Sequence, residues 1–261
     1  MTDRTEEARH RAGPGRHWEE SYSFDFAATD ASVGGYVRLG LRPGDAVAWY
    51  WAAFVTDGAG PHPPLVLVRD HDAPLPRGRS LEVRTSGLWA DHTCETPLEH
   101  WTVGLEAFGL ALDDPLEAYG AERGDPCPLG MDLEWEAAAT ARDEAQGGYE
   151  QWCTVHGEVL VGAERLEVDG VGWRTHTWGD RDWWAAEPWT WAGGASEVEA
   201  VVNGDGLIVG ASVDGRRATV VAHAPVAIRG HDGRSSRLDR ALCRVEAEAG
   251  WVERLTPPDV A

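Results

Sequence analysis

The sequence predicts an all-β protein made of two barrel or sandwich halves in tandem, with few short helices. Its apolar residues recur in short segments that alternate apolar and polar positions, which is typical of half-buried strands. A glycine or proline break separates nearly every two of these segments, as expected for strands joined by turns. The length of 261 residues provides enough chain for two hydrophobic cores. A βαβ architecture would need long helical patterns between the strands, and these are missing.

The first half follows a polar start. Residues 1–16 are rich in charged residues and show no periodicity, so we expect them to be disordered. Residues 22–26 alternate aromatic and polar side chains and predict the first strand. Residues 46–55 are apolar on both faces, which predicts a central strand carrying Trp49 and Trp51. Further strands are expected at residues 36–42, 65–68, 81–85, 103–112 and 131–136.

The second half follows a soft segment of alanine, acidic residues and glycine at residues 137–148. We therefore place an N-terminal β domain at residues 17–147 and a C-terminal β domain at residues 148–261. A short helix is expected within residues 113–124, because Pro115 follows an acidic residue and suits a first helical turn. Strands of the second half are expected at residues 155–161, 166–168, 189–191, 198–202, 207–213, 218–224, 226–229 and 242–248.

The charge of the chain narrows the range of partners. Its 44 acidic and 23 basic residues give a net charge of −21, and every basic residue other than histidine is arginine. Such a surface repels nucleic acids and anionic membranes, and a polyanionic substrate is excluded unless arginines gather locally. The polar start lacks the apolar run of a signal peptide, and no run of about eighteen apolar residues occurs. We expect a soluble cytoplasmic protein without membrane insertion.

No metal or cofactor is expected from the spacing of the possible ligands. The cysteines at 94, 127, 153 and 243 form no C-x-x-C pair and predict four free thiols. Within the tetrad at residues 69–72, Asp70, His71 and Asp72 are adjacent, so they cannot all face one ion, and a solvated loop is expected there. The glycine motifs of dinucleotide, P-loop and serine-hydrolase sites do not occur.

Residues 170–184 contain four tryptophans, one histidine, two arginines and two aspartates. If this stretch is extended, Arg174, His176 and Trp178 share one face of the strand, opposite residues 173, 175 and 177. Gly179 then permits a bend that re-aims the residues after it. The expected catalytic residues are His176, Trp178, Asp180, Arg181 and Asp182. The expected substrate-binding residues are Arg174, Trp183, Trp184, Trp189, Trp191, Trp49, Trp51 and Asp205. A structural interpretation stays open beside this one: an aromatic core strand followed by a solvated charged turn.

The pattern G-x-G-x-R-x-H-x-W-G-x-R-D-W of this stretch, with Tyr149-Glu150-Gln151 before it, resembles the AttH-like and carotenoid 1,2-hydratase (hydroxyneurosporene synthase) superfamily. The resemblance is densest over residues 149–184. It implies two lipocalin-like β-barrel halves around an apolar cavity, with hydration of an isolated alkene as the best-known activity. It also implies that His176 and Trp178 match the H-x-W element on which the catalytic proposal for the hydratases centres. The aspartate of that proposal is left open between Asp182, Asp180 and Asp205.

These observations lead to one main hypothesis and two alternatives. The main hypothesis is a cofactor-independent enzyme of natural-product biosynthesis that hydrates, isomerises or cyclises a hydrophobic polyene, terpenoid-like or polyketide-like molecule. This chemistry needs an apolar cavity, an acid and aromatic faces that stabilise cationic character. The alternatives are a pericyclase with the same fold and a non-catalytic, lipocalin-type binder in which His176 and the aspartates are structural. The direction of the carboxyl and imidazole groups, toward the cavity or away from it, distinguishes catalysis from binding.

Overall fold

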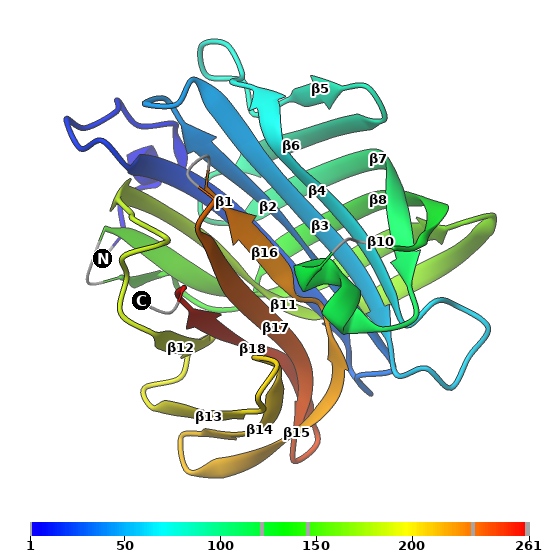
Figure 1. Cartoon of the computed structure of the whole chain (residues 1–261). Coiled ribbons are helices and arrows are strands. Elements are labelled where there is room, and N and C mark those ends of the chain that lie inside the picture. The colour runs from blue at the N-terminus through cyan, green and yellow to red at the C-terminus, as the bar shows by residue number, and fades with distance from the viewer. Residues whose placement is uncertain (1, 121–122, 145–146, 231–232, 259–261) are drawn as a thin grey trace.

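The protein is described by a computed structural model that covers all residues except 1, 121–122, 145–146, 231–232 and 259–261. The all-β prediction is confirmed: the described residues form two antiparallel sheets and two short 3-10 helices (Figure 1). The helices are η1 (Arg4–Glu7) and η2 (Pro115–Tyr119). The strands of the larger sheet are β1 (Trp18–Ala28), β2 (Val33–Arg42), β3 (Val47–Thr56), β4 (Leu65–Pro74), β5 (Val83–Thr85), β6 (Leu88–Thr96), β7 (His100–Leu112), β8 (Asp125–Ala137), β9 (Arg142–Asp143), β10 (Gly148–Val161) and β11 (Glu164–Asp180). The strands of the smaller sheet are β12 (Trp189–Ala192), β13 (Val198–Val202), β14 (Ile208–Val213), β15 (Arg216–His223), β16 (Val226–Arg229), β17 (Ser235–Val245) and β18 (Glu248–Thr256).

The larger sheet closes on itself. Its strand order is β4-β3-β2-β1-β11-β10-β8-β7-β6-β5, and an additional pairing of β4 with β7 completes the ring. The pairing of β1 with β11 joins the start of the sheet to its last strand. Closure leaves fewer free strand edges and encloses one apolar interior.

The smaller sheet lies against the outside of the ring. Its order is β12-β18-β17-β15-β14-β13, with β16 paired to β17. Figure 1 shows these yellow-to-red strands crossing the blue strands β1, β2 and β3. The contact buries β2 and β3 on both faces, which explains why residues 46–55 are apolar at nearly every position.

The N-terminal segment is ordered, contrary to the expectation for residues 1–16. Glu7, at the end of η1, is only 5% exposed, and it lies inside the ring, where it bonds to side chains of β7, β10 and β11. His10 stacks on Trp178 with ring centroids 3.9 Å apart. Polar composition suggested disorder, but these polar groups are satisfied by long-range partners within the barrel.

Two further expectations need revision. The boundary between the sheets follows Asp180, because β10 and β11 pair with β8 and β1, so the division proposed at residues 147 and 148 falls inside the larger sheet. The tetrad at residues 69–72 belongs to β4 and is not a loop, and the indole of Trp51 donates to His71 Nε2 at 2.7 Å. The short helix expected near Pro115 is present as η2, capped by Asp114.

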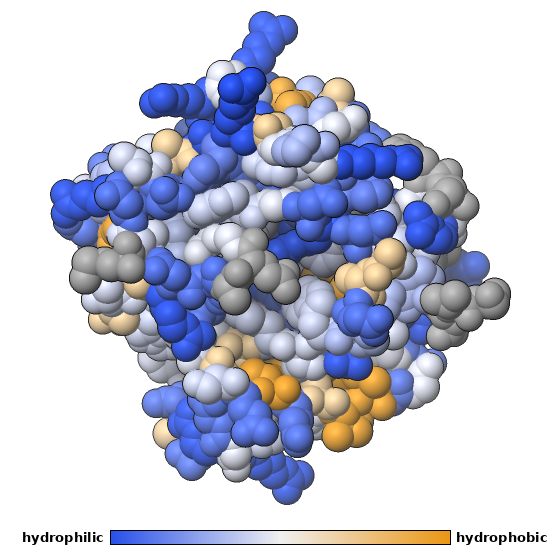
Figure 2. Space-filling view, turned by 90° about the vertical axis from the view of Figure 1, so that its left-hand side faces the viewer, coloured by the Kyte–Doolittle hydropathy of each residue, from blue (hydrophilic) through white to orange (hydrophobic). Residues whose placement is uncertain are grey.

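All four cysteines are free. Among the described residues, no helix has the length and apolar character needed to span a bilayer. Figure 2 views the molecule from the left of Figure 1 and shows a mainly hydrophilic face that is hollowed near its centre.

Candidate functional site

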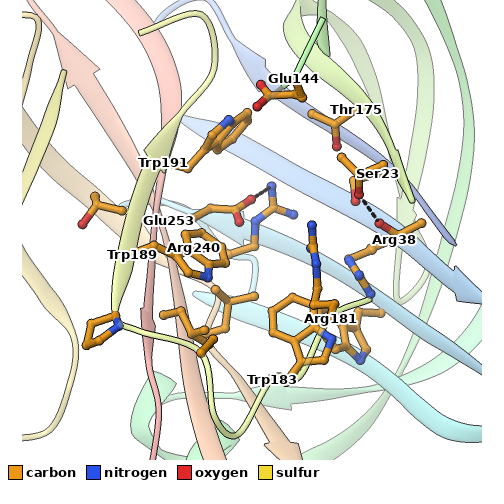
Figure 3. Close-up of a pocket in the computed structure, with 18 of the residues that line it drawn as sticks. Ser23, Arg38, Glu144, Thr175, Arg181, Trp183, Trp189, Trp191, Arg240 and Glu253 are labelled. Atoms are coloured by element: carbon orange, nitrogen blue, oxygen red, sulfur yellow. Dashed lines mark hydrogen bonds and ion pairs between the residues drawn. The ribbon is translucent and has the colours of Figure 1, made fainter. Parts of the chain in front are cut away.

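A cavity of about 760 Å³ lies between the ring and the smaller sheet. Figure 3 shows polar and aromatic side chains from both sheets converging on it. Its volume is within the range of about 300–1,000 Å³ that is usual for small-molecule sites. The lining residues are Ser21, Ser23, Asp25, Arg38, Trp51, Glu144, Trp173, Thr175, Thr177, Asp180, Arg181, Asp182, Trp183, Ala185, Ala186, Glu187, Pro188, Trp189, Thr190, Trp191, Leu238, Arg240, Glu253 and Leu255.

The alternation of β11 decides which of its residues reach this cavity. Residues 173, 175 and 177 point outward from the ring and line the cavity. Arg174 and His176 point into the ring, where they are 2% and 1% exposed. The face shared by these two residues was predicted from the sequence, and the structure turns that face away from the cavity.

Arg174 belongs to a buried polar network inside the ring. Its guanidinium donates to Glu7 Oε1 at 2.8 Å and to the hydroxyl of Tyr149 at 2.9 Å, and it also bonds to Gln151. Burial acts against the charge of Arg174, but the neighbouring Tyr149 and Glu7 hold its pKa above the usual value. The positive charge of Arg174 is therefore paired with Glu7 inside the ring.

His176 belongs to a second buried group. Its Nε2 lies 2.9 Å from Glu20 Oε1, and its ring stacks on Tyr22 with centroids 4.0 Å apart. Burial lowers the pKa of His176, whereas the bond to Glu20 raises that of His10. The same bonds outweigh burial and lower the pKa of Glu20 to about 2.

Two clusters of side chains among the described residues could hold a metal ion. The ligand atoms of His10, Glu20 and His176 lie within 4.8 Å of one another, and those of His100, Glu134 and Glu136 do so at the surface. The members of the first cluster are far apart in the sequence, so residue spacing could not reveal it. Both histidines already bond to Glu20.

Asp25 is the buried acid of the cavity, and a gap in the strand pairing holds it there. The pairing of β1 with β11 is interrupted at Asp25 and Phe26. Asp25 Oδ1 accepts the backbone N–H of Trp173 at 2.8 Å. The indoles of Trp135 and Trp251 donate to the carbonyls of Asp25 and Phe26 at 2.8 and 2.9 Å. Side chains thus replace the missing ladder bonds.

Burial makes Asp25 unusual among the acids of the protein. It raises the pKa of Asp25 to about 7, although Arg240 and the Trp173 N–H act in the opposite direction. Arg240 Nη2 lies 3.6 Å from Asp25 Oδ2 but only 2.5 Å from Glu253 Oε1, so its charge is largely neutralised by Glu253. A carboxyl that titrates near neutral pH can donate or accept a proton there.

Arginines and indoles form the end of the cavity near Trp183. Glu19 is buried and bonds to Arg38, to Arg42 at 2.7 Å and to the indole of Trp183 at 2.9 Å. Burial would raise the pKa of Glu19, but these arginines and Arg181 lower it to about 2. The guanidinium of Arg38 lies over the ring of Trp51, 4.5 Å from its centroid.

The opposite wall is formed by β12 and is fixed to the ring. The indole of Trp191 donates to Glu150 at 3.2 Å, and Glu150 also bonds to Arg142. The turn after β12 wraps Trp173 closely: a Cβ added to Gly193 would lie 2.3 Å from that indole. Because the glycines of this turn have no side chain, the turn can pack directly against the indole of Trp173.

The structure distributes the predicted site residues over three regions. Those lining the cavity are Trp51, Asp180, Arg181, Asp182, Trp183, Trp189 and Trp191. Those inside or against the ring are Arg174, His176 and Trp178. Those elsewhere are Trp49 and Trp184, which pack between the sheets, and Asp205, which lies in the exposed turn between β13 and β14.

The two aspartates next to Arg181 have structural contacts with His17 and with the turn after β11; His17 Nε2 lies 3.6 Å from Asp182 Oδ2. Asp180 Oδ1 accepts the backbone N–H of His17 at 2.8 Å. Asp182 Oδ1 accepts the N–H groups of Trp184 and Ala185 at 3.0 and 3.1 Å and so caps the turn after β11.

Sequence reasoning missed Asp25, Arg38 and Arg240. All three look like the exposed polar positions of alternating strands. Asp25 and Arg38 on the ring and Arg240 on β17 are buried because the two sheets cover each other, and local alternation does not indicate that contact. One feature of the sequence could have drawn attention to Asp25: it is an acid between two phenylalanines.

Comparison with known proteins gives a family and a fold. The family described as a domain of unknown function (DUF7064) matches residues 3–207. No curated protein matches the sequence. The structure is similar to that of kievitone hydratase from Nectria haematococca, with 11% identity, a TM-score of 0.51 and coverage of 98% of this chain and 93% of the hydratase.

Two other solved structures are similar at lower scores. CghA with Sch210972 has 11% identity and a TM-score of 0.48, with 94% of this chain and 90% of that chain covered. An AttH candidate from Nitrosomonas europaea has 10% identity and a TM-score of 0.47, with 91% and 92% covered. The likeness to the hydratase shows the fold, and the fold that the resemblance implied is confirmed.

Proposed function

The chain belongs to the DUF7064 family, and from the cavity between its sheets we propose that it is an enzyme for proton-transfer chemistry on a hydrophobic small molecule. Hydration, isomerisation and cyclisation all fit this class. The observation that carries the proposal is Asp25, a carboxyl buried in an aromatic-lined cavity, whose pKa burial raises to about 7.

For hydration, Asp25 in its acid form donates its proton to one alkene carbon of the bound substrate. Water then adds to the other carbon, and its surplus proton returns to the Asp25 carboxylate, so that alkene and water give an alcohol. The faces of Trp183, Trp189 and Trp191 would stabilise the positive charge that develops in between. In isomerisation, a neighbouring carbon of the cation returns a proton to the Asp25 carboxylate instead of adding water. In cyclisation, a second alkene of the substrate attacks the cation before that proton is returned.

One observation favours the alternative of a non-catalytic binder. The imidazole of His176 points away from the cavity and is bonded to Glu20. Because the carboxyl of Asp25 does line the cavity, we place the enzyme first and the binder second.

The test of the proposed function uses isotopes and does not require the substrate to be known in advance. A panel of polyene and prenylated ketones and acids is incubated with the protein in D₂O or in H₂¹⁸O, and mass spectrometry follows incorporation of deuterium or ¹⁸O. We expect incorporation with the wild-type protein and a loss of at least a hundredfold with Asp25→Asn.

Asp182→Asn is the matched control, because an asparagine oxygen can still cap the turn that Asp182 caps. Loss of turnover in Asp182→Asn with full activity in Asp25→Asn would transfer the acid role to Asp182, the residue expected from the sequence. No incorporation for any bound compound would favour the binder.

A further inference from the structure

Positive charge collects at one end of a cavity in an acidic protein. Arg38 and Arg42 bond to Glu19, and Arg181 lies over the ring of Trp183, whose indole N–H donates to Glu19. Among the described residues, two acids form ion pairs with these arginines: Glu19 with Arg38 and Arg42, and Asp45 with Arg42 at 3.0 Å. This group therefore has one more cation than anion.

The surplus charge resides on Arg181. Within the part of the chain that the structure describes, its side chain donates no hydrogen bond and forms no ion pair. Its guanidinium lies 5.2 Å from the ring centroid of Trp183, and Figure 3 shows it pointing into the cavity. The neighbouring aspartates do not bond to it, since Asp180 accepts from His17 and Asp182 caps a turn.

Arg38 has an unused donor in the same place. It is 5% exposed, it lines the cavity, and its Nη1 is buried without a hydrogen-bond partner. A buried donor without a hydrogen-bond partner is unfavourable, and more so when it is charged. Arg38 and Arg181 both lie over the ring of Trp183, 5.1 and 5.2 Å from its centroid, so the two guanidinium groups are neighbours and their charges repel each other. An anion shared between them would remove both penalties.

Part of the cavity wall offers an apolar surface to the body of a ligand. Trp189, Leu238 and Leu255 lie on the wall formed by the smaller sheet, and Trp191 joins them. A ligand with a negatively charged oxygen at one end and an apolar remainder would complement both parts of the cavity.

We propose that the substrate is a hydrophobic acid whose single oxygen anion, a carboxylate or the enolate of a 1,3-dicarbonyl group, binds between Arg181 and Arg38. The assignment rests on the proposed function, because it places the head group in the cavity that contains Asp25. The net charge of −21 excluded a polyanionic substrate unless arginines gather locally. Arg38 and Arg181 gather inside the cavity, so a single anion can bind there although the acidic surface repels anions.

Binding of matched probes tests the assignment. Retinoic acid and retinol share a polyene body and differ in the head group, and each is titrated against the wild-type protein by quenching of tryptophan fluorescence. We expect the acid to bind at least tenfold more tightly than the alcohol, and this difference to shrink with added salt. Dibenzoylmethane tests the enolate source, because a bound enolate shows a red-shifted absorption band.

Arg181→Gln is the decisive variant, because among the described residues the substitution breaks no side-chain hydrogen bond or ion pair and loses only the contact with the Trp183 ring. It should weaken binding of the acid at least tenfold and leave retinol binding unchanged, while Arg181→Lys restores part of the affinity. Arg165→Gln, which removes an exposed arginine paired with Glu158 on the surface, is the matched control and should change neither affinity.

The outcomes separate the two proposals. Equal affinity for acid and alcohol, or an unchanged acid affinity in Arg181→Gln, overturns the head-group assignment. Neither result contradicts the proposed function, because the probes still bind. If no probe binds to the wild-type protein, the cavity is not a ligand site, and both the assignment and the proposed function fail.

Discussion

Asp25 Oδ1 accepts a hydrogen bond from the backbone N–H of Trp173 at the interruption in the pairing of β1 with β11. A Cβ on the neighbouring Gly172 would lie only 1.9 Å from the Asp25 carbonyl oxygen, so the strands approach closely there. The carboxyl group of Asp25 is thus held by a backbone N–H on a short side chain, and it faces the cavity. Such positioning favours proton transfer at a fixed point.

The first prediction concerns the pH dependence of this acid. The folded-state pKa of Asp25 is raised from 3.8 to about 7, so its acid form predominates below pH 7. If Asp25 is the proton donor, kcat/KM should fall about tenfold per pH unit above 7. The rate of isotope incorporation between pH 5 and 9 measures this, and a profile that stays flat through pH 7 would contradict the assignment.

The same shift affects stability. Between pH 4 and 7 the folded state binds more protons at Asp25 than the unfolded state, so this group makes the protein less stable as pH rises through that range. Asp25→Asn should remove that component. Urea unfolding of both proteins at pH 5 and pH 7 reveals the difference in slope.

A second prediction concerns the glycine turn around Trp173. Gly193→Ala places a methyl group 2.3 Å from the indole, so the ring or the turn must shift. We expect a loss of roughly 1–3 kcal/mol in the free energy of unfolding, as for other overpacked sites. Gly210→Ala is the control, because a Cβ there meets nothing within 4 Å. Equal stability of the two variants in chemical denaturation would show that the turn does not hold Trp173.

A third prediction concerns the buried carboxylate of Glu7. Glu7→Gln leaves the Arg174 guanidinium without its charged partner inside the ring. The loss should be about 3–5 kcal/mol, as is usual when one member of a buried ion pair is removed. Glu99→Gln breaks an exposed pair with Arg4 and should cost less than about 1 kcal/mol. Thermal melts of the two variants give the comparison, and similar melting temperatures would mean that Glu7 is not structural.

A fourth prediction concerns His92 inside the ring. Burial lowers its pKa from 6.5 to about 4, so it stays neutral in the folded state while the unfolded chain takes up a proton below pH 6.5. Stability should therefore decrease as pH falls from 6.5 to 4, by up to about 3 kcal/mol from this residue alone. His92→Leu should show a smaller decrease. Urea midpoints at pH 6.5 and 4.5 check this; parallel losses in both proteins would argue against it.

The sequence predicted where the strands lie better than it predicted which of their faces meet the cavity. Strand positions and the alternation of β11 follow from residue periodicity, which is a local property. The choice of which face meets the cavity depends on where the smaller sheet packs. That contact joins Trp251 to Phe26, residues at opposite ends of the chain. Arg174 and His176 were therefore placed on a common face, but whether that face met the cavity could not be decided.

The acids show the same limit. Asp182 stood out because it lies within a dense motif, whereas Asp25 lies in an ordinary strand pattern. Their different environments come from tertiary burial: Asp25 is 3% exposed, and Asp182 caps a turn at the edge of the cavity. A pKa shift caused by burial has no signature in local sequence.

The buried position of Glu7 also has a consequence for the order of assembly. Its partners Tyr149 and Arg174 are 142 and 167 residues further along the chain. During synthesis Glu7 emerges before these partners, and its docking site does not exist until β10 and β11 have left the ribosome. The segment around Glu7 must therefore remain undocked until the last strands of the ring are in place.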